Sequence, residues 1–309
     1  MGAIDFAITT YQNADFKQLF LVGLLPFFGL SAVIEAWRFR GTGIYSLKDS
    51  AASMALGASY VTLEVVVNAL FVYAAMGWVH QFRLMDIAIT PLSFVLLFVL
   101  VDFLFYVYHV TAHKVRWFWA THVVHHASEH MNFTTAGRQS TLYAFSGLFA
   151  FFLPAVVLGF EPAWVLFALA TNLSYQWFIH TQWIKKLPRP IEFIFNTPSH
   201  HRVHHGRNPE YIDRNFGGTF IIWDRLFGTF VEEREDLPPE YGITRQIHSY
   251  NPITLTLHEF IALFRDMAKP GPLWLRLKHL WATPEWERPE TQRQPAKANA
   301  SSIAIRQER

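Results

Sequence analysis

Residues 87–113 read IAITPLSFVLLFVLVDFLFYVYHVTAH, a long apolar run that ends on two histidines. Its apolar part, residues 87–108, reaches the roughly 20 residues that a helix needs to cross the hydrocarbon core of a bilayer. Residues 19–37 and 51–79 have the same character. These three stretches predict membrane-spanning helices.

Two further apolar stretches, residues 142–160 and 162–180, are separated only by Glu161. So short a connection predicts a helical hairpin that either crosses the bilayer or lies shallowly in it. The fold class that follows is an all-α integral membrane protein with about four to five membrane helices. A helical cap on the cytoplasmic side would hold the histidines.

The composition agrees with a membrane protein and excludes several kinds of site. Only 16% of the 309 residues are charged, against about 25% in soluble domains. The chain has no cysteine, which excludes disulfides, thiolate-bound haem and cysteine-held iron–sulfur clusters. The net charge of +2 gives a nucleic-acid partner no electrostatic footprint.

Basic residues predict how the chain is oriented, because short cytoplasmic loops are enriched in Lys and Arg. The loop between the second and third predicted spans has only Arg83. The basic residues of the other connections are Arg38, Arg40, Lys48, Lys114, Arg116, Arg138, Lys185, Lys186 and Arg189. This distribution of basic residues predicts a multi-pass protein with every histidine cluster on the cytoplasmic face.

The chain divides into four regions by composition. Residues 1–84 hold the N-terminal membrane helices, and residues 85–235 hold the third span, the hairpin and the histidine clusters. Residues 236–283 contain one or two amphipathic helices that suit either a membrane interface or ordinary packing. Residues 284–309 are polar and charged, and we expect them to be disordered.

Three histidine clusters carry the chemistry. They are His109-Val-Thr-Ala-His113, His122-Val-Val-His125-His126 and His201-Arg-Val-His204-His205. Each contains a pair four residues apart, which on a helix places both imidazoles on one face and within reach of one metal. The clusters supply 2 + 3 + 3 = 8 imidazoles, enough for two metal ions with four nitrogens each.

Imidazole binds zinc, copper, iron and nickel alike, so the spacing alone leaves the metal open. A membrane metal transporter or metal-binding protein is the alternative of another class. A transporter, however, should place ligands across the bilayer midplane, whereas these clusters lie at one end of the spans. A bis-histidine haem would leave two of the clusters without a role.

Polar side chains inside the apolar stretches mark the neighbourhood of the site, because polar groups in lipid are costly. Asp102 lies two turns before His109 and could orient a ligand. Asn172, Gln176 and His180 form a stripe on residues 162–180. His180 is a candidate ninth ligand, and His200, beside the third cluster, is a further candidate.

The motifs HxxxH, HxxHH and HxxHH in this order resemble the fatty acid hydroxylase/sterol desaturase superfamily of membrane di-iron oxygenases. The similarity runs from about Asp102 to Phe230 and is greatest with the alkylglycerol monooxygenase branch. The supporting blocks are HHASEHMN at 125–132, GRQS at 137–140, IHT at 179–181, NTPSHHRVHHGRN at 196–208, YIDRNFGG at 211–218 and IWDRLFGTF at 222–230.

This resemblance implies two iron ions that activate O2 and an oxygen atom inserted into a C–H bond of a lipid from the bilayer. In the alkylglycerol branch the ether bond is then cleaved, and a tetrahydropterin supplies the electrons. Other branches hydroxylate or desaturate sterols or fatty acyl chains, with a cytochrome b5-like or ferredoxin-like partner. Residues expected to support the ligands or contact the lipid headgroup are Glu129, Asn132, Arg138, Asp213, Asn215 and Asp224.

Overall fold

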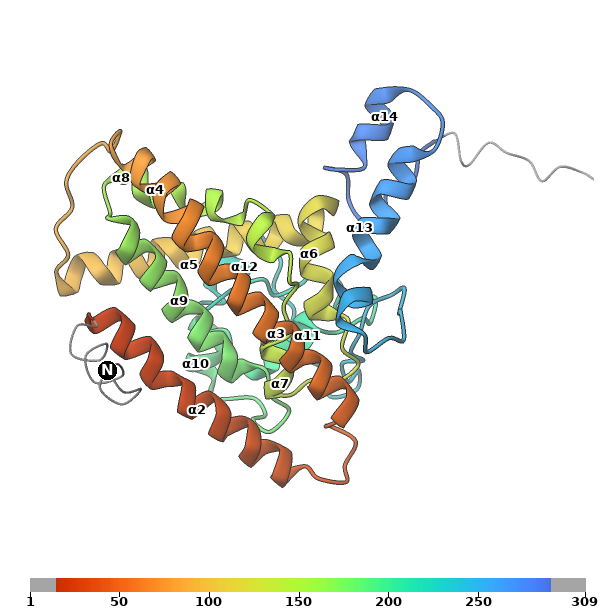
Figure 1. The fold of residues 1–309 in the computed structure, drawn as a ribbon. Helices are drawn as coiled ribbons and strands as arrows, with labels where there is room; N and C mark the ends of the chain where they lie inside the picture. The colour runs from red at the N-terminus through yellow and green to blue at the C-terminus, as the bar shows by residue number, and fades with distance from the viewer. Residues whose placement is uncertain (1–14, 290–309) are drawn as a thin grey trace, which may run out of the picture.

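The computed structural model describes residues 15–289. Within this range the regular structure is helical, and extended segments meet only at isolated bridges such as Phe195 with Phe220. Helix α5 (Pro91–Lys114) runs through the middle of the bundle beside α9 (Pro162–Ile179) and α6 (Arg116–His126). Figure 1 shows α2 (Phe16–Arg38) and α3 (Leu47–Val67) on the outside of this bundle.

Three helices are long and apolar enough to cross a membrane: Phe16–Arg38, Leu47–His80 and Pro91–Lys114. The second combines α3, a π-helical turn η1 (Asn68–Val72) and α4 (Tyr73–His80). Thr90 caps α5 with a capping box, and Pro91 occupies its first turn. The three spans predicted from residues 19–37, 51–79 and 87–108 are therefore helical and of sufficient length.

The stretch predicted as one helix over residues 142–160 is helical only in part, with its longest helix at Leu148–Leu158. The chain instead forms η2 (Tyr143–Phe145), η3 (Leu148–Phe152) and α8 (Leu153–Leu158). Gly147 lies at φ +84°, in the left-handed region, and interrupts the run. Its apolar residues serve the core, since Phe152, Ala155 and Val156 are buried in the same cluster as residues of α5.

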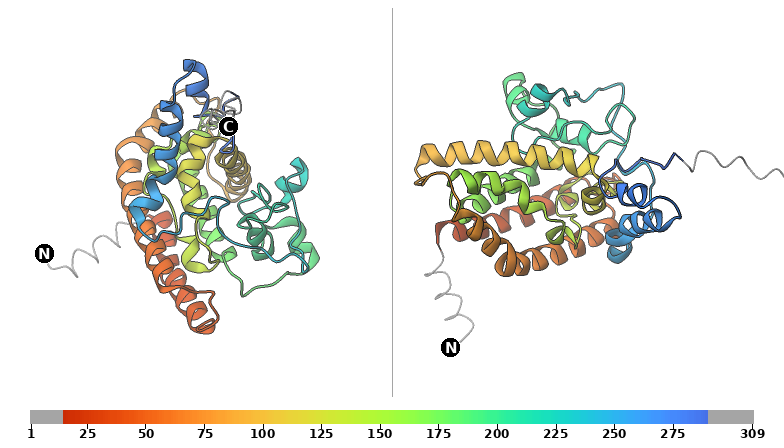
Figure 2. Two further views of the ribbon diagram at one scale, coloured as in Figure 1. Left: turned by 90° about the vertical axis from the view of Figure 1, so that its right-hand side faces the viewer. Right: turned by 90° about the horizontal axis from the view of Figure 1, so that it is seen from above.

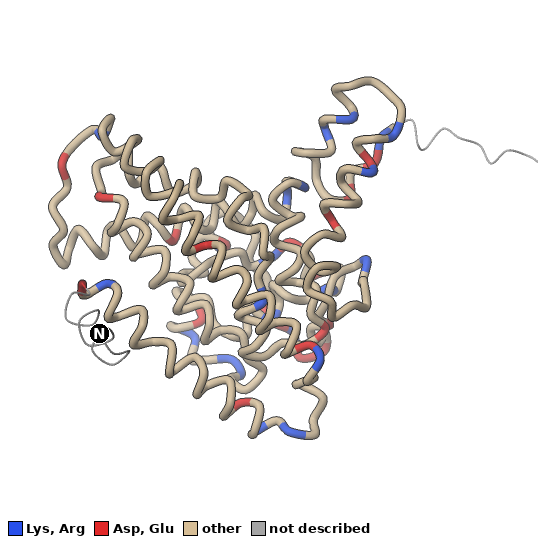
Figure 3. The backbone as a smooth tube through the Cα atoms, viewed as in Figure 1, with Lys and Arg blue, Asp and Glu red and all other residues tan. Residues whose placement is uncertain are grey.

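The long helices differ in what they bury. Ten side chains of α5 are buried, whereas Glu35 is the buried residue of α2. Charged residues gather near the ends of α2, and α5 has Asp102 within its length (Figure 3). The apolar exterior of α2 is what a lipid-facing helix presents, and α5 provides the scaffold of the interior.

Residues 181–235 do not form a separate layer beyond the spans. Their short helices α10 (Arg189–Ile194), α11 (Pro198–His204) and α12 (Ile222–Phe227) lie along one side of α5 (Figure 2). At the histidine end of α5, the ring of His109 lies 4.8 Å from that of His122 on α6 and 4.4 Å from that of His204 on α11. We also find α7 (Phe133–Ala136) directly after the second histidine cluster.

The C-terminal region, for which one or two amphipathic helices were expected, contains α13 (Pro252–Ala268) and α14 (Leu273–Lys278). Helix α13 packs against α6. The expected disorder does not begin at residue 284, because Arg288 is buried and donates to His279 Nε2 (3.0 Å) and to the carbonyl of Lys269. Residues 290–309 of the expected tail lie outside the described residues.

Candidate metal centre

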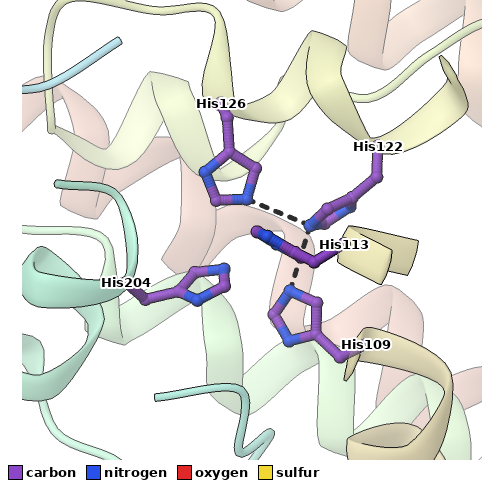
Figure 4. A group of neighbouring side chains, drawn as sticks. All are labelled: His109, His113, His122, His126 and His204. Carbon is purple, nitrogen blue, oxygen red and sulfur yellow. Dashed lines mark hydrogen bonds between the residues drawn. The ribbon is translucent and has the colours of Figure 1, made fainter. Parts of the chain in front are cut away.

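Nine buried histidines converge in two groups within the part of the chain that the structure describes. We call them the five-histidine group and the four-histidine group. In each, the facing ring nitrogens all lie within 4.8 Å of one another. Figure 4 shows the five-histidine group, whose rings point toward a common centre. The members are His109, His113, His122, His126 and His204 in the first, and His125, His180, His201 and His205 in the second.

The helical spacing explains why these side chains meet. His109 and His113 lie one turn apart at the end of α5, and His122 and His126 are one turn apart on α6. His125 lies three residues after His122 and turns toward the other group. The third cluster divides in the same way, with His204 in the five-histidine group and its neighbours His201 and His205 in the other.

Three outer nitrogens of the five-histidine group are held by one loop. The Nδ1 of His109 donates to the carbonyl of Phe216 (2.8 Å), and that of His204 donates to the carbonyl of Arg214 (2.9 Å). The Nδ1 of His113 lies 3.2 Å from Asp213 Oδ1. Residues 213–216 therefore orient three of the five rings, an arrangement typical of metal-bound histidines.

The four-histidine group is oriented by other elements. His125 Nδ1 donates to the carbonyl of Arg138 (3.0 Å), and His180 Nδ1 donates to the carbonyl of Gln176 (2.6 Å) at the end of α9. The Arg138 side chain is itself fixed, since it donates to the carbonyl of Val124 and to Asp49. This side of the centre is thus held by helix ends and a buried ion pair.

The tautomers that these bonds require leave lone pairs facing one another. A carbonyl oxygen only accepts, so the Nδ1 atoms of His125 and His180 carry the protons and their Nε2 atoms do not. Those two Nε2 atoms are 3.1 Å apart. Among the described residues, the buried Nε2 atoms of His113 and His204 have no hydrogen-bond partner. A cation in each group would satisfy these nitrogens, so the residues fit two bound metal ions.

The environment keeps the rings neutral and ready to bind a cation. Burial, followed by the nearby imidazoles, lowers the pKa values of His122, His126 and His205 well below 6.5. Asp213 has its pKa lowered to about 2: burial would raise it, but the hydrogen bonds from His113 and Lys114 outweigh burial. A negative carboxylate therefore faces the outer nitrogen of His113.

The side chains of Asp102, Asn172 and Gln176 form one buried hydrogen-bond network beside the site, and none of these side chains is hydrogen-bonded to a histidine ring. Asp102 accepts from the backbone N–H of Thr219 (2.6 Å) and from Trp223 Nε1 (2.8 Å). Asn172 donates to Asp102, and Gln176 donates to Asn172 Oδ1 (2.7 Å). Asp102 thus holds residues 219–223, which follow the loop that orients His109, and is not hydrogen-bonded to His109 itself.

Asp224 acts on the same loop. Its carboxylate accepts from the backbone N–H groups of Phe216 and Gly217, both at 2.7 Å. Asn215 also fixes this loop, since its Nδ2 donates to the carbonyls of His200 (3.1 Å) and Val231 (2.7 Å). The loop that supports the five-histidine group is therefore fixed by two polar side chains, those of Asp224 and Asn215.

Three predicted site residues are not brought to the histidines. His200 lies outside both groups, with its Nε2 2.9 Å from Glu192 Oε2. Glu129 is partly exposed and lies 3.8 Å from Arg207. Asn132 caps α7 and donates to the carbonyl of Ile44 (2.8 Å). Adjacency in sequence did not place these side chains at the metal centre.

Glu35 is a supporting residue that the sequence reasoning missed. It is fully buried and accepts from the backbone N–H of Phe133 (2.9 Å) and from the hydroxyls of Tyr45 (2.5 Å) and Thr181. Phe133 follows the second cluster and Thr181 follows His180. A carboxylate inside an apolar span was the signal that could have revealed it.

A cavity of about 220 Å³ opens onto the five-histidine group. It reaches three of those five rings and, from the other group, only His205. Trp119, Ile212 and Ile243 provide apolar walls, and Arg207, Asp213 and Glu285 provide charged ones. The cavity can thus admit a molecule that is partly apolar and partly polar.

Fold and site together define a helical membrane protein whose buried histidines can hold metal. Residues 94–229 match the fatty acid hydroxylase family, so this region belongs to that family. The resemblance inferred from the motifs is confirmed. No solved structure matches the chain.

Curated relatives extend the comparison beyond this region. The chain is 35% identical over 273 residues to alkylglycerol monooxygenase of Xenopus tropicalis, and 34% identical over 268 residues to that of Homo sapiens. Each alignment covers 85% of this chain and 59% of the relative. Ornithine lipid hydroxylase of Rhizobium tropici is 27% identical over 159 residues, covering 51% of this chain and 48% of that protein. These relatives are oxidoreductases, the class predicted for this chain.

Proposed function

We propose that this protein is a membrane-bound di-iron oxygenase that inserts one oxygen atom from O2 into a C–H bond of a lipid. The observation that carries the proposal is the convergence of nine histidines in two groups. The outer nitrogens of His109, His125, His180 and His204 donate to backbone carbonyls, and the inner nitrogens of each group face one another. Two iron ions, when bound, would activate O2 with electrons from an external donor.

The protein's own residues would hold and select the reactants. The inner nitrogens of both groups bind the metal ions, and the loop 213–216 keeps three rings of the five-histidine group in position. The cavity at that group would receive the part of the lipid that reacts, between Trp119, Ile212 and Ile243. Burial of all nine rings would keep bulk water from the reacting carbon.

We propose an O-alkylglycerol as the substrate, with hydroxylation beside the ether oxygen followed by ether cleavage. The support is the similarity to two vertebrate alkylglycerol monooxygenases. The chain spans 59% of the length of those relatives, so the substrate has to be established on this chain. The similarity to an ornithine lipid hydroxylase favours a second candidate, hydroxylation of a lipid without cleavage.

We place the active site on the cytoplasmic face, where the basic loop residues predict it. Electrons would come from a tetrahydropterin or from a cytochrome b5-like or ferredoxin-like partner protein. The metal-transporter alternative has no comparable support, because every member of both histidine groups lies at one end of α5 and α9 or beyond it.

The test combines metal analysis with product analysis. Full-length protein purified without chelators should contain about two iron ions per chain, since the two histidine groups fit two metal ions. Incubation with alkylglycerols and acyl lipids, labelled dioxygen and each class of electron donor should give a product that carries one labelled oxygen atom.

A matched pair of variants provides the control. His204→Ala should abolish labelled product, whereas His248→Ala should not, because the His248 side chain is largely exposed and lies outside both groups. One equivalent of zinc without iron would contradict the oxygenase. Labelled hydroxy acyl lipid with intact alkylglycerol would reject ether cleavage in favour of the second candidate.

A further inference from the structure

Residues 216–227 fold back along α5 instead of standing beyond its end. The backbone N–H groups of Thr219 and Phe220 donate to Asp102, which lies midway along α5. The ring of Phe220 reaches one turn further, to 6.1 Å from that of Phe98. Helix α12 then returns, and Phe227 stacks on Tyr106 at 5.5 Å.

Residues 189–195 lie beside residues 216–227. Phe195 and Phe220 form an isolated antiparallel bridge, and their rings are 5.5 Å apart. The following residue, Asn196, accepts through its carbonyl from the hydroxyl of Tyr175 on α9 (2.6 Å). The two segments therefore meet at their tips between α5 and α9. We call residues 189–195 and 216–227 the wedge.

Contacts between α2 and α9 locate the depth of the wedge. Near one end of α2, the Phe20 ring lies 5.7 Å from that of Phe167, and further along it the Phe28 ring lies 4.9 Å from that of Trp177. Asn172 lies halfway between Phe167 and Trp177 on α9 and donates to Asp102. The tip of the wedge is thus level with the middle of α2.

Helix α2 marks the hydrocarbon region, because it exposes apolar side chains along its length. Val22 is 64% exposed, Leu25 60% and Leu30 58%. The wedge carries apolar side chains that are equally exposed: Phe193 at 61%, Leu226 at 71% and Phe227 at 54%. At that level a bilayer, and not water, would surround them.

The wedge satisfies the condition for non-helical backbone inside a membrane, which is that its polar groups pair within the protein. Asp102 accepts from the N–H groups of its tip, as described above. Asn196 Nδ2 donates to the carbonyls of Gly217 (2.6 Å) and Gly218 (3.3 Å). At Gly218 a Cβ atom would lie 2.7 Å from Asn172 Oδ1, so the close approach itself requires glycine.

The chain enters the wedge from the level of the membrane interface. Trp183 lies 6.3 Å, ring to ring, from Phe39 at the end of α2. Lys185, Lys186 and Arg189 follow, where phosphate groups of lipids would meet them. The apolar residues of α10 come after these basic residues.

We infer that the wedge is a re-entrant element, inserted from the histidine face of the membrane to about the middle of the hydrocarbon core. Its exposed apolar side chains contact the acyl chains of the bilayer. Because its residue Phe216 orients His109, the metal centre is supported by a segment embedded in lipid.

The absence of cysteine from the chain makes this depth measurable. Phe193→Cys and Leu226→Cys would each be spin-labelled on the full-length protein in phosphatidylcholine vesicles. Power saturation compares collisions with oxygen, which concentrates in lipid, and with a water-soluble nickel chelate. Leu25→Cys is the control in the hydrocarbon core, Trp37→Cys the control at the interface and Glu210→Cys the control in water.

Both wedge labels should show the high oxygen-to-nickel collision ratio of Leu25→Cys. A ratio equal to that of Glu210→Cys would overturn the inference, and so would a ratio equal to that of Trp37→Cys, which would place the wedge only at the interface. Unchanged metal content in each variant shows that it has folded. The measurement needs no turnover, so it is independent of the proposed oxygenase activity.

Discussion

The two histidine groups share ligand chemistry but differ in their surroundings. Three of the five rings in the five-histidine group line the cavity, whereas only His205 of the four-histidine group reaches it. The first group is oriented by the loop 213–216, and the second by the end of α9 and by the carbonyl of Arg138. One group is open and loop-supported, and the other is enclosed and helix-supported.

This difference indicates that the two histidine groups have different functions. Metal sites that take part in reactions keep an accessible position, and structural sites are closed. The loop 213–216 contains two non-glycine residues in the left-handed region, Asp213 at φ +58° and Asn215 at φ +57°. Such strained conformations cluster at functional sites. We therefore expect substrate contact at the five-histidine group and metal retention at the four-histidine group.

The largest effect should come from removing one ligand from either group. His126→Ala and His125→Ala alter neighbouring residues that belong to different groups. Each should lower turnover by more than about 100-fold, because the loss of an outer partner alone costs 10–100-fold. His126→Ala leaves four imidazoles and should retain nearly two metal ions, whereas His125→Ala leaves three and should retain about one.

Elemental analysis and turnover assays on the purified variants check this prediction. Exposed His248 again supplies a control, as His248→Ala. If His126→Ala loses more metal than His125→Ala, the four imidazoles left in the five-histidine group do not hold its metal, and the prediction from the number of ligands is wrong.

A smaller effect should follow from Asp213→Asn. Asparagine tolerates the left-handed backbone, so the substitution removes the negative charge opposite His113 without straining the loop. Loss of such a carboxylate weakens metal binding by about 10–100-fold. A chelator should therefore release the metal of the five-histidine group sooner, while the four-histidine group keeps its metal.

Asp236→Asn is the matched control, since Asp236 is exposed and paired with Arg234 away from the site. The readout is the rate and stoichiometry of metal release. Simultaneous release from both groups would mean that Asp213 stabilises the whole centre, and the proposed independence of the two supports would fail.

Local spacing explains what the sequence predicted well. The i, i+4 pairs on α5 and α6 fix which imidazoles share a face, and His180 joins them because α9 ends beside α5. Apolar length likewise predicted the helices Phe16–Arg38, Leu47–His80 and Pro91–Lys114. In these cases the residues of a single helix are enough to predict the feature.

Features that depend on two elements could not be predicted. The division into five and four ligands, instead of four and four, depends on which histidines of α6 and which of residues 201–205 face each group. The interruption of residues 142–160 depends on packing as well as on Gly147: at Gly159 a Cβ atom would lie 2.0 Å from the carbonyl oxygen of Met85, so the chain turns sharply there. Hydropathy does not report such contacts.

The smallest effect should come from narrowing the cavity without touching a ligand. Ile212 is 37% exposed and lines the cavity next to Asp213. Ile212→Trp should lower kcat/KM for the lipid substrate by about 10-fold, which corresponds to roughly 1.4 kcal/mol of transition-state binding. Ile253→Trp on α13 is the control, because Ile253 is exposed but does not line the cavity. Metal content should stay unchanged in both variants. If Ile212→Trp leaves kcat/KM unchanged while the metal is fully bound, the lipid reaches the centre by another route, and the open character of the five-histidine group has no part in substrate access.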